Sequence, residues 1–174
     1  MSACRFLLTL GWLSLLSQSA YAQTLDQPTV AFPFQVALTA PADSSQASSG
    51  QVLAAGKPVV LAFWLSTCAP CMHELAAYTA QWAAWQQQAD FQLLAISIDF
   101  PERFGKVRQL VAEKKWPFPA YWDGLRGFKD ILPGGLNGLP QVFVFDKKGK
   151  LVYHHRKYMP GDEVALFEAV KAAR

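Results

Sequence analysis

The chain has 174 residues, a formal net charge of +3 and three cysteines, Cys4, Cys68 and Cys71. Three cysteines are too few for a disulfide framework, and the slight positive charge is scattered in short runs such as "EKK" and "DKKGK", which are typical of solvated turns. These features exclude a disulfide-stapled miniprotein and supply no nucleic-acid motif, so we expect one ordinary globular domain without a nucleic-acid partner.

The N-terminus has the three parts of a secretory signal peptide. Arg5 gives a short cationic region, an apolar run follows it, and the sequence "AYA" ending at Ala22 is a small-x-small cleavage site. The apolar run is shorter than the about 20 residues of a membrane-spanning helix, so an uncleaved anchor is the weaker alternative. We predict that residues 1–22 are removed together with Cys4, which leaves a periplasmic or otherwise extracytoplasmic protein.

Residues 23–56 are predicted to be an N-terminal leader and linker, and residues 57–174 the folded domain. The first segment is rich in Ala, Ser, Gln and Thr, and its stretch "APADSSQASSGQ" is typical of a soft linker. One strand is expected near residues 34–38. We expect the whole segment to pack loosely on the domain.

The domain is expected to begin with alternating strands and helices. The run "PVVLAFWL" at 58–65 is apolar and β-branched, which is typical of a strand buried on both faces. It ends at the cysteine pair, and helix-favouring residues continue from Pro70, a residue that a first helical turn tolerates. The runs at 91–99 and 101–116 predict a second buried strand and a second helix.

The C-terminal third is expected to contain a hairpin and a last helix. After a loop at 117–138, two strand-like runs at 140–156 flank a turn in which Gly149 is available for a positive φ. An amphipathic helix is expected over 162–173. Its apolar side is predicted to carry Val164, Phe167 and Val170.

The spacing Cys68-x-x-Cys71 fits several kinds of site. A zinc site needs a second pair of ligands, and His154 and His155, adjacent on a strand, point to opposite faces. Covalent haem attachment needs a histidine directly after the second cysteine, where Met72 stands. Inert buried thiols have no need of a position at a helix start. We therefore favour a redox-active pair and expect no metal.

The order strand, Cys-x-x-Cys, helix gives the two thiols different predicted roles. Cys68 is expected at or just before the helix N-terminus, where unpaired N–H groups and the helix dipole favour a thiolate. Cys71 is expected one turn further in and more covered. Cys68 is therefore the predicted attacking thiol, and Cys71 the thiol that resolves the mixed disulfide.

From about Lys57 to the C-terminus, an ordered set of motifs resembles a known family. The motifs are "GKPVVLAFW", the pattern Cys68-x-x-Cys71-x-x-Glu74, "LLAISID", "WPFPAYWDG" and "GLPQVFVFDKKGKLVYHHRKY". In this order they resemble the extracytoplasmic TlpA/ResA/DsbE-like thiol-disulfide oxidoreductases. The resemblance implies a thioredoxin-like three-layer α/β/α fold, with a central mixed sheet, flanking helices and a C-terminal β-hairpin plus helix.

The resemblance also implies roles for residues around the cysteines. The Leu139–Pro140 bond is expected to be cis and to face the cysteines, and the backbone beside it to pair with an incoming substrate strand. Leu139, Pro140 and Thr67 are thus the predicted substrate-binding residues. Thr67 stands where the family usually has Trp, and its hydroxyl can hydrogen-bond locally. Ala62 stands where thioredoxins bury an acid, so another group must assist proton transfer.

Glu74 is the candidate for this proton transfer and completes the predicted catalytic set with Cys68 and Cys71. A nearby carboxylate disfavours thiolate formation and can accept a proton when the resolving thiol attacks. The alternative is that Glu74 only complements the helix N-terminus. Since the dipeptide Ala69-Pro70 supplies no histidine to stabilise a thiolate, a weak-to-moderate reductant is expected.

The resulting prediction is a monomeric protein-disulfide reductase without a cofactor. The resemblance implies substrates such as apocytochrome c or the copper-site cysteines of an oxidase, and a membrane thiol donor that restores the dithiol. A thiol peroxidase and a Cu(I)-binding metallochaperone remain as alternatives. Against a peroxidase, Leu61 and Leu65 stand where its pattern needs Pro and Thr. Against a copper chaperone, a methionine and histidine cluster is missing.

Overall fold

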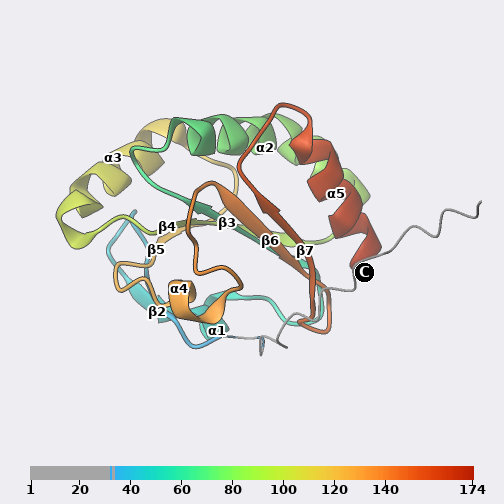
Figure 1. Ribbon diagram of the computed structural model, residues 1–174, viewed down its shortest axis with the longest axis horizontal. Helices are drawn as coiled ribbons and strands as arrows, with labels where there is room; N and C mark the ends of the chain where they lie inside the picture. The colour runs from blue at the N-terminus through green and yellow to red at the C-terminus, as the bar shows by residue number, and fades with distance from the viewer. Residues whose placement is uncertain (1–31, 33) are drawn as a thin grey trace, which may run out of the picture.

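The computed structural model of the protein describes Phe32 and residues 34–174 (Figure 1). The predicted signal peptide, with Cys4 and the cleavage site at Ala22, lies outside the described residues. The elements in chain order are β1 Ala37–Thr39, β2 Gln46–Ser48, α1 Ser49–Val52, β3 Val59–Trp64, α2 Ala69–Gln88, β4 Gln92–Ser97, the 3-10 turn η1 Pro101–Arg103, α3 Phe104–Lys114, β5 Ala120–Trp122, α4 Phe128–Ile131, β6 Gln141–Phe145, β7 Leu151–Arg156 and α5 Asp162–Ala172.

All seven strands form one mixed sheet in the order β2-β1-β5-β4-β3-β6-β7. Strands β3, β4 and β5 are parallel, so their carboxyl ends meet at one end of the sheet. Strand β6 runs antiparallel to β3 with Gln141 opposite Phe63, which brings the start of β6 to the same end. The loop that carries the cysteines therefore lies beside the loop that precedes β6.

Helices cover both faces of the sheet, as Figure 1 shows: α2, α3 and α5 lie on one side, and α1 and α4 on the other. Strand β3 is buried along its whole length, because its alternate side chains enter two different hydrophobic clusters. The cluster beneath α2 contains Val60, Ala62 and Trp64; the opposite cluster contains Val59, Leu61 and Phe63. The predicted three-layer α/β/α fold is confirmed.

Residues 34–56 differ from the loosely packed leader that the sequence suggested. Phe34, Val36 and Leu38 are buried in the cluster on the α1 and α4 side, and the β1–β2 hairpin joins the sheet through a pair between Thr39 and Trp122. The apolar residues alternate with exposed ones, as expected for a half-buried strand. The polar composition reflects the exposed side of this hairpin and does not indicate a linker.

Two further expectations need correction. The expected loop at 117–138 contains β5 and α4, which have three and four residues and are too short to give a periodic signal. In α5 the buried residues are Leu166, Phe167 and Val170, whereas Val164 is 61% exposed. The hairpin turn is as predicted, with Gly149 at φ +80°.

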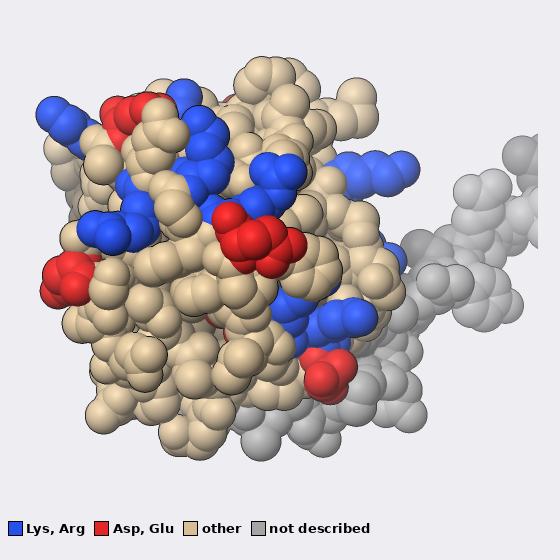
Figure 2. Space-filling model, turned by 90° about the vertical axis from the view of Figure 1, so that its left-hand side faces the viewer, with Lys and Arg blue, Asp and Glu red and all other residues tan. Residues whose placement is uncertain are grey.

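The side of the molecule where α3 lies and α2 begins is shown face-on in Figure 2. Lys, Arg, Asp and Glu side chains mix in its upper part and toward its lower right, whereas the lower left carries little charge. Within the described part of the chain, no helix combines the length and the apolar character that crossing a membrane requires.

Candidate active site

The cysteine pair lies where β3 leads into α2. Cys68 is the N-cap residue of α2, and its Sγ accepts a hydrogen bond from the backbone N–H of Cys71 at 3.2 Å. Pro70 lies in the first turn, where a missing N–H costs no helical hydrogen bond. The helix therefore begins directly after Cys68, which places this sulfur beside the unpaired N–H groups and the positive end of the helix dipole.

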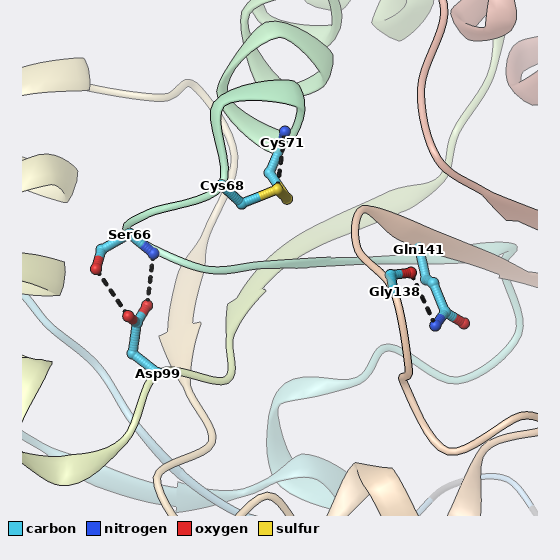
Figure 3. Close-up of a disulfide and its surroundings, with 6 residues drawn as sticks. All are labelled: Ser66, Cys68, Cys71, Asp99, Gly138 and Gln141. Atoms are coloured by element: carbon cyan, nitrogen blue, oxygen red, sulfur yellow. Dashed lines mark hydrogen bonds between the residues drawn. A yellow bond between two sulfur atoms is a disulfide. The ribbon is translucent and has the colours of Figure 1, made fainter.

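Cys68 and Cys71 are joined by a disulfide, with 5.3 Å between their Cα atoms (Figure 3). Cys68 is partly buried, whereas Cys71 is fully buried beneath the first turns of α2. Only the first of the two sulfurs is thus open to a partner molecule. This asymmetry suits the attacking and resolving roles that were predicted for them.

Glu74 lies one turn beyond Cys71 and is only 1% exposed. Burial raises the pKa of this carboxyl to about 8; the Tyr78 hydroxyl opposes the shift, and the Asp162 carboxylate adds to it. Glu74 is therefore mostly protonated at neutral pH, in contrast to the carboxylate that the sequence argument assumed. The alternative role for Glu74 was a favourable interaction with the positive end of the helix dipole. This effect is confined to the first turn, and Glu74 lies beyond the first turn of α2, so the dipole does not explain an acid at this position.

Groups from distant parts of the chain surround this acid. Burial and then the Glu74 charge raise the pKa of Tyr78, which lies one turn further along α2. Burial, Asp162 and Glu74, in this order, raise the pKa of Tyr153 on β7. The Asp162 carboxylate in turn contacts His155 Nε2 at 3.0 Å. No sequence pattern indicates this cluster, because Tyr153 on β7 and Asp162 on α5 are far from Glu74 along the chain and come near it only in the folded protein.

A buried acid that the sequence analysis did not single out fixes the loop before Cys68. Asp99 accepts hydrogen bonds from the Ser66 N–H and the Ser66 hydroxyl, both at 2.7 Å, and from the Ser97 hydroxyl at 2.8 Å (Figure 3). The indole N–H of Trp122 donates to the Asp99 carbonyl oxygen at 2.8 Å. The sequence signal for this residue is an acid two residues after the end of a buried strand, β4, which pairs with the strand that leads to the cysteines.

The Leu139–Pro140 peptide bond is cis, as the resemblance implied. The pairing of β3 with β6 places this bond at the same end of the sheet as Cys68. Pro140 is buried, and Leu139 is partly buried. Neither the backbone N–H nor the backbone C=O of Leu139 hydrogen-bonds to any other described residue, so both are free for an incoming strand. The substrate-binding roles of these residues remain predictions.

The two departures from the family pattern are both visible in the structure. Thr67 is exposed beside Cys68, and its hydroxyl makes no hydrogen bond within the described chain. Ala62 is buried in the same cluster as Cys71, so the place of the missing acid is filled by apolar contacts. Across Phe32 and residues 34–174, no group of three or more His, Cys, Asp or Glu side chains is arranged to hold a metal ion.

The family follows from the sequence match. Residues 31–154 match the model of the AhpC/TSA family. The chain belongs to this family. Thiol-based redox activity in general is supported by this family, by the position of the disulfide and by the cis bond. The predicted resemblance is confirmed at the level of family and fold.

Solved structures with the same fold include a thioredoxin-like protein and a thiol:disulfide interchange protein. A thioredoxin-like protein from Porphyromonas gingivalis is 30% identical, with a TM-score of 0.69, and the match covers 84% of this chain and 94% of that one. A Chlorobium tepidum protein assigned as the thiol:disulfide interchange protein DsbE is 23% identical, with a TM-score of 0.69 and coverage of 84% and 97%.

A third similar structure belongs to a different class of enzyme. The bacterioferritin comigratory protein of Xanthomonas campestris, described by its alkyl peroxide reduction activity, is 20% identical, with a TM-score of 0.64 and coverage of 83% and 96%. At this identity the match shows the shared fold alone. No curated protein matches the chain.

Proposed function

We propose that the protein is an extracytoplasmic thiol-disulfide oxidoreductase that reduces disulfides in partner proteins. The observation that carries the proposal is the Cys68–Cys71 disulfide at the start of α2, with one accessible and one buried sulfur, at the same end of the sheet as the unbonded backbone of Leu139. An extended substrate can pair with this backbone while its disulfide meets Cys68.

The reaction consists of two exchange steps. The Cys68 thiolate attacks one sulfur of the substrate disulfide, a mixed disulfide forms, and the other substrate sulfur leaves as a thiolate that takes up a proton. Cys71 then loses its proton and attacks Cys68 Sγ. This closes the Cys68–Cys71 disulfide and releases the second substrate thiol. Two electrons pass from the dithiol to the substrate.

Glu74 is the group that handles the Cys71 proton in this scheme. Its pKa of about 8 means that about a tenth of the molecules hold it ionised at pH 7, and this fraction rises with pH. In the ionised form it accepts the proton as Cys71 attacks, and in the neutral form it returns one when the disulfide is reduced again. The same residue thus serves both directions of the cycle.

The location and the partners belong to the proposal as well. The signal-peptide pattern that ends at Ala22 supports export, and the resemblance to TlpA/ResA/DsbE-like proteins supports a membrane thiol donor that restores the dithiol. The substrates proposed on the same ground are disulfide-containing proteins such as apocytochrome c or the copper-site cysteines of an oxidase. The proposed active form is a monomer without a cofactor.

The test is the reduction potential of the Cys68–Cys71 pair, measured by equilibrating the purified protein with glutathione or dithiothreitol buffers. A potential near or below about −220 mV is expected for a reductase recharged by a membrane donor. A potential above about −150 mV, toward that of DsbA, would mean that the protein oxidises its partners. Cys68→Ser is the matched control, because it cannot form the disulfide.

A thiol peroxidase is the second candidate, favoured by the family match and by the Xanthomonas structure. Leu61 is buried in β3, and Leu65 is partly buried after it, so both positions that need Pro and Thr are used for packing. We therefore expect the reduced protein to consume hydrogen peroxide no faster than Cys68→Ser. Titration of the same reduced protein with Cu(I) tests the metallochaperone alternative, for which no stoichiometric binding is expected.

A further inference from the structure

Gln141 is a fully buried polar residue at the start of β6, directly after the cis-proline. Its side-chain amide nitrogen donates to the carbonyl oxygen of Asn137 at 2.9 Å and to that of Gly138 at 3.3 Å (Figure 3). Both acceptors belong to the loop that leads to Leu139 and Pro140. The Gln141 side chain therefore folds back on the loop and ties it to the sheet.

His154 on β7 fixes the orientation of this amide. Its Nε2 lies 3.0 Å from Gln141 Oε1. Because two carbonyl oxygens, which only accept, occupy the amide nitrogen, Oε1 is the acceptor in the third contact, and His154 donates from a protonated Nε2. The imidazole stacks on Phe143 with ring centroids 4.1 Å apart and 10° between the planes, which holds the ring in place.

The loop is also held at its two ends. Arg156 Nη2 donates to the Gly134 carbonyl oxygen at 3.0 Å, and the Lys157 N–H donates to the Pro140 carbonyl oxygen at 2.8 Å. Within the described chain, the loop is thus anchored on both sides of Leu139, while Leu139 itself keeps a free N–H and C=O. Anchoring of this kind lowers the ordering cost that a flexible loop would incur on binding.

Gln141 acts at a distance from the cysteines. Along β6 its side chain lies on the same face as that of Phe143, which packs in the cluster on the α1 and α4 side, whereas Cys71 belongs to the cluster beneath α2. A change at Gln141 therefore reaches the reaction through the loop and leaves the surroundings of the two sulfurs intact.

We propose that Gln141, oriented by His154, is a positioning residue that holds the 137–140 loop ready for a polypeptide substrate and thereby sets the affinity for such substrates. The intrinsic redox chemistry of the Cys68–Cys71 pair does not depend on it. This inference rests on the proposed function, because it concerns the same site and a protein disulfide as substrate.

The test compares a protein substrate with a small one. In Gln141→Met the side chain keeps its length but loses both donors, and we expect the KM for the disulfides of insulin to rise by about tenfold, the scale of one to two net hydrogen bonds. The rate with the small disulfide 5,5′-dithiobis(2-nitrobenzoate) and the reduction potential should stay unchanged. Val152→Thr, on the exposed side of β7, is the control and should leave all three quantities unchanged.

A second variant and a second readout keep the inference testable if Gln141→Met does not fold. His154→Phe preserves the stacking on Phe143 but removes the donor to Gln141. We expect faster hydrogen exchange of the Lys157 amide, which donates to the Pro140 carbonyl oxygen, together with the same rise in KM. Unchanged exchange and KM in a folded variant would overturn the inference. An equal loss with the small disulfide would also overturn it, because the effect would then lie at the cysteines.

The two proposals fail in different ways. If the wild-type protein does not reduce insulin, the proposed function fails. The role of Gln141 in holding the loop is then judged by the exchange of the Lys157 amide alone, which needs no substrate. If the wild-type protein reduces insulin and both variants behave like it, the proposed function stands and the inference about Gln141 is wrong.

Discussion

The buried carboxyl of Glu74 should make the stability of the oxidised protein fall as the pH rises. Its pKa is raised from the ordinary value of 4.5 to about 8, first because burial penalises the charge. In the unfolded chain the group ionises near 4.5, so between these two values the unfolded state has released a proton that the folded state keeps. Full stability is thus present below pH 4.5 and is lost progressively up to about pH 8.

The size of the effect follows from the difference between the two pKa values. It corresponds to a loss of about 5 kcal/mol above pH 8 and of about 3 kcal/mol at pH 7. Glu74→Gln keeps the shape of the neutral acid but cannot ionise. We therefore expect the variant to match the wild type at pH 4 and to be more stable by about 3 to 5 kcal/mol between pH 7 and pH 8.5.

The assay is urea unfolding of the oxidised proteins at pH 4, 7 and 8.5, followed by circular dichroism. The exposed Glu102 supplies a matched control, because Glu102→Gln should follow the wild type at every pH. If the difference in unfolding free energy between wild type and Glu74→Gln stayed constant over this pH range, Glu74 would have the same pKa in the folded and the unfolded chain. The proposed role as a proton carrier with a pKa near neutrality would then be lost.

Variants at three other buried positions test the remaining features. Leu38→Ala should lower the free energy of unfolding in urea by about 2 to 5 kcal/mol, because the side chain lies in the core; a loss below about 0.5 kcal/mol would show that β1 is not part of it. Asp99→Asn should cost about 2 to 4 kcal/mol, since the carboxylate accepts three hydrogen bonds. The exposed Asp130→Asn should cost less than about 0.5 kcal/mol, and equal melting temperatures of these two variants would contradict the role of Asp99. Cys71→Ser should trap a mixed disulfide with a protein substrate, visible on a non-reducing gel. If Cys68→Ser formed such an adduct instead, Cys71 would be the attacking thiol and the predicted roles of the two cysteines would be wrong.

The parts of the site that depend on local sequence could be predicted. The buried run of β3, the cysteine spacing and Pro70 all lie within 13 residues of one another, and together they determine where α2 begins. Glu74 could be placed near Cys71 from helical spacing alone. Its protonation could not be predicted, because the pKa depends on burial and on the charge of Asp162, and both act only in the folded chain.

The parts that depend on contacts between distant segments could not be predicted. Asp99 and Ser66 are 33 residues apart and meet only because β3 and β4 pair in a particular register. A strand was expected near residues 34–38, but its pairing with β2 was not, because the exposed residues of this hairpin include Ser, Gln and Asp, which also dominate linkers. Composition does not distinguish a linker from the exposed side of a short strand pair.

The β1–β2 hairpin has a consequence for how the domain can be trimmed. A chain cut to residues 57–174 would keep both cysteines, Glu74 and the cis-proline. It would also lose Phe34, Val36 and Leu38 from the cluster on the α1 and α4 side, and it would uncover the backbone groups of β5 at the sheet edge. Such a fragment would present a bare strand edge next to an apolar surface, and it should self-associate although every residue of the proposed chemistry is present.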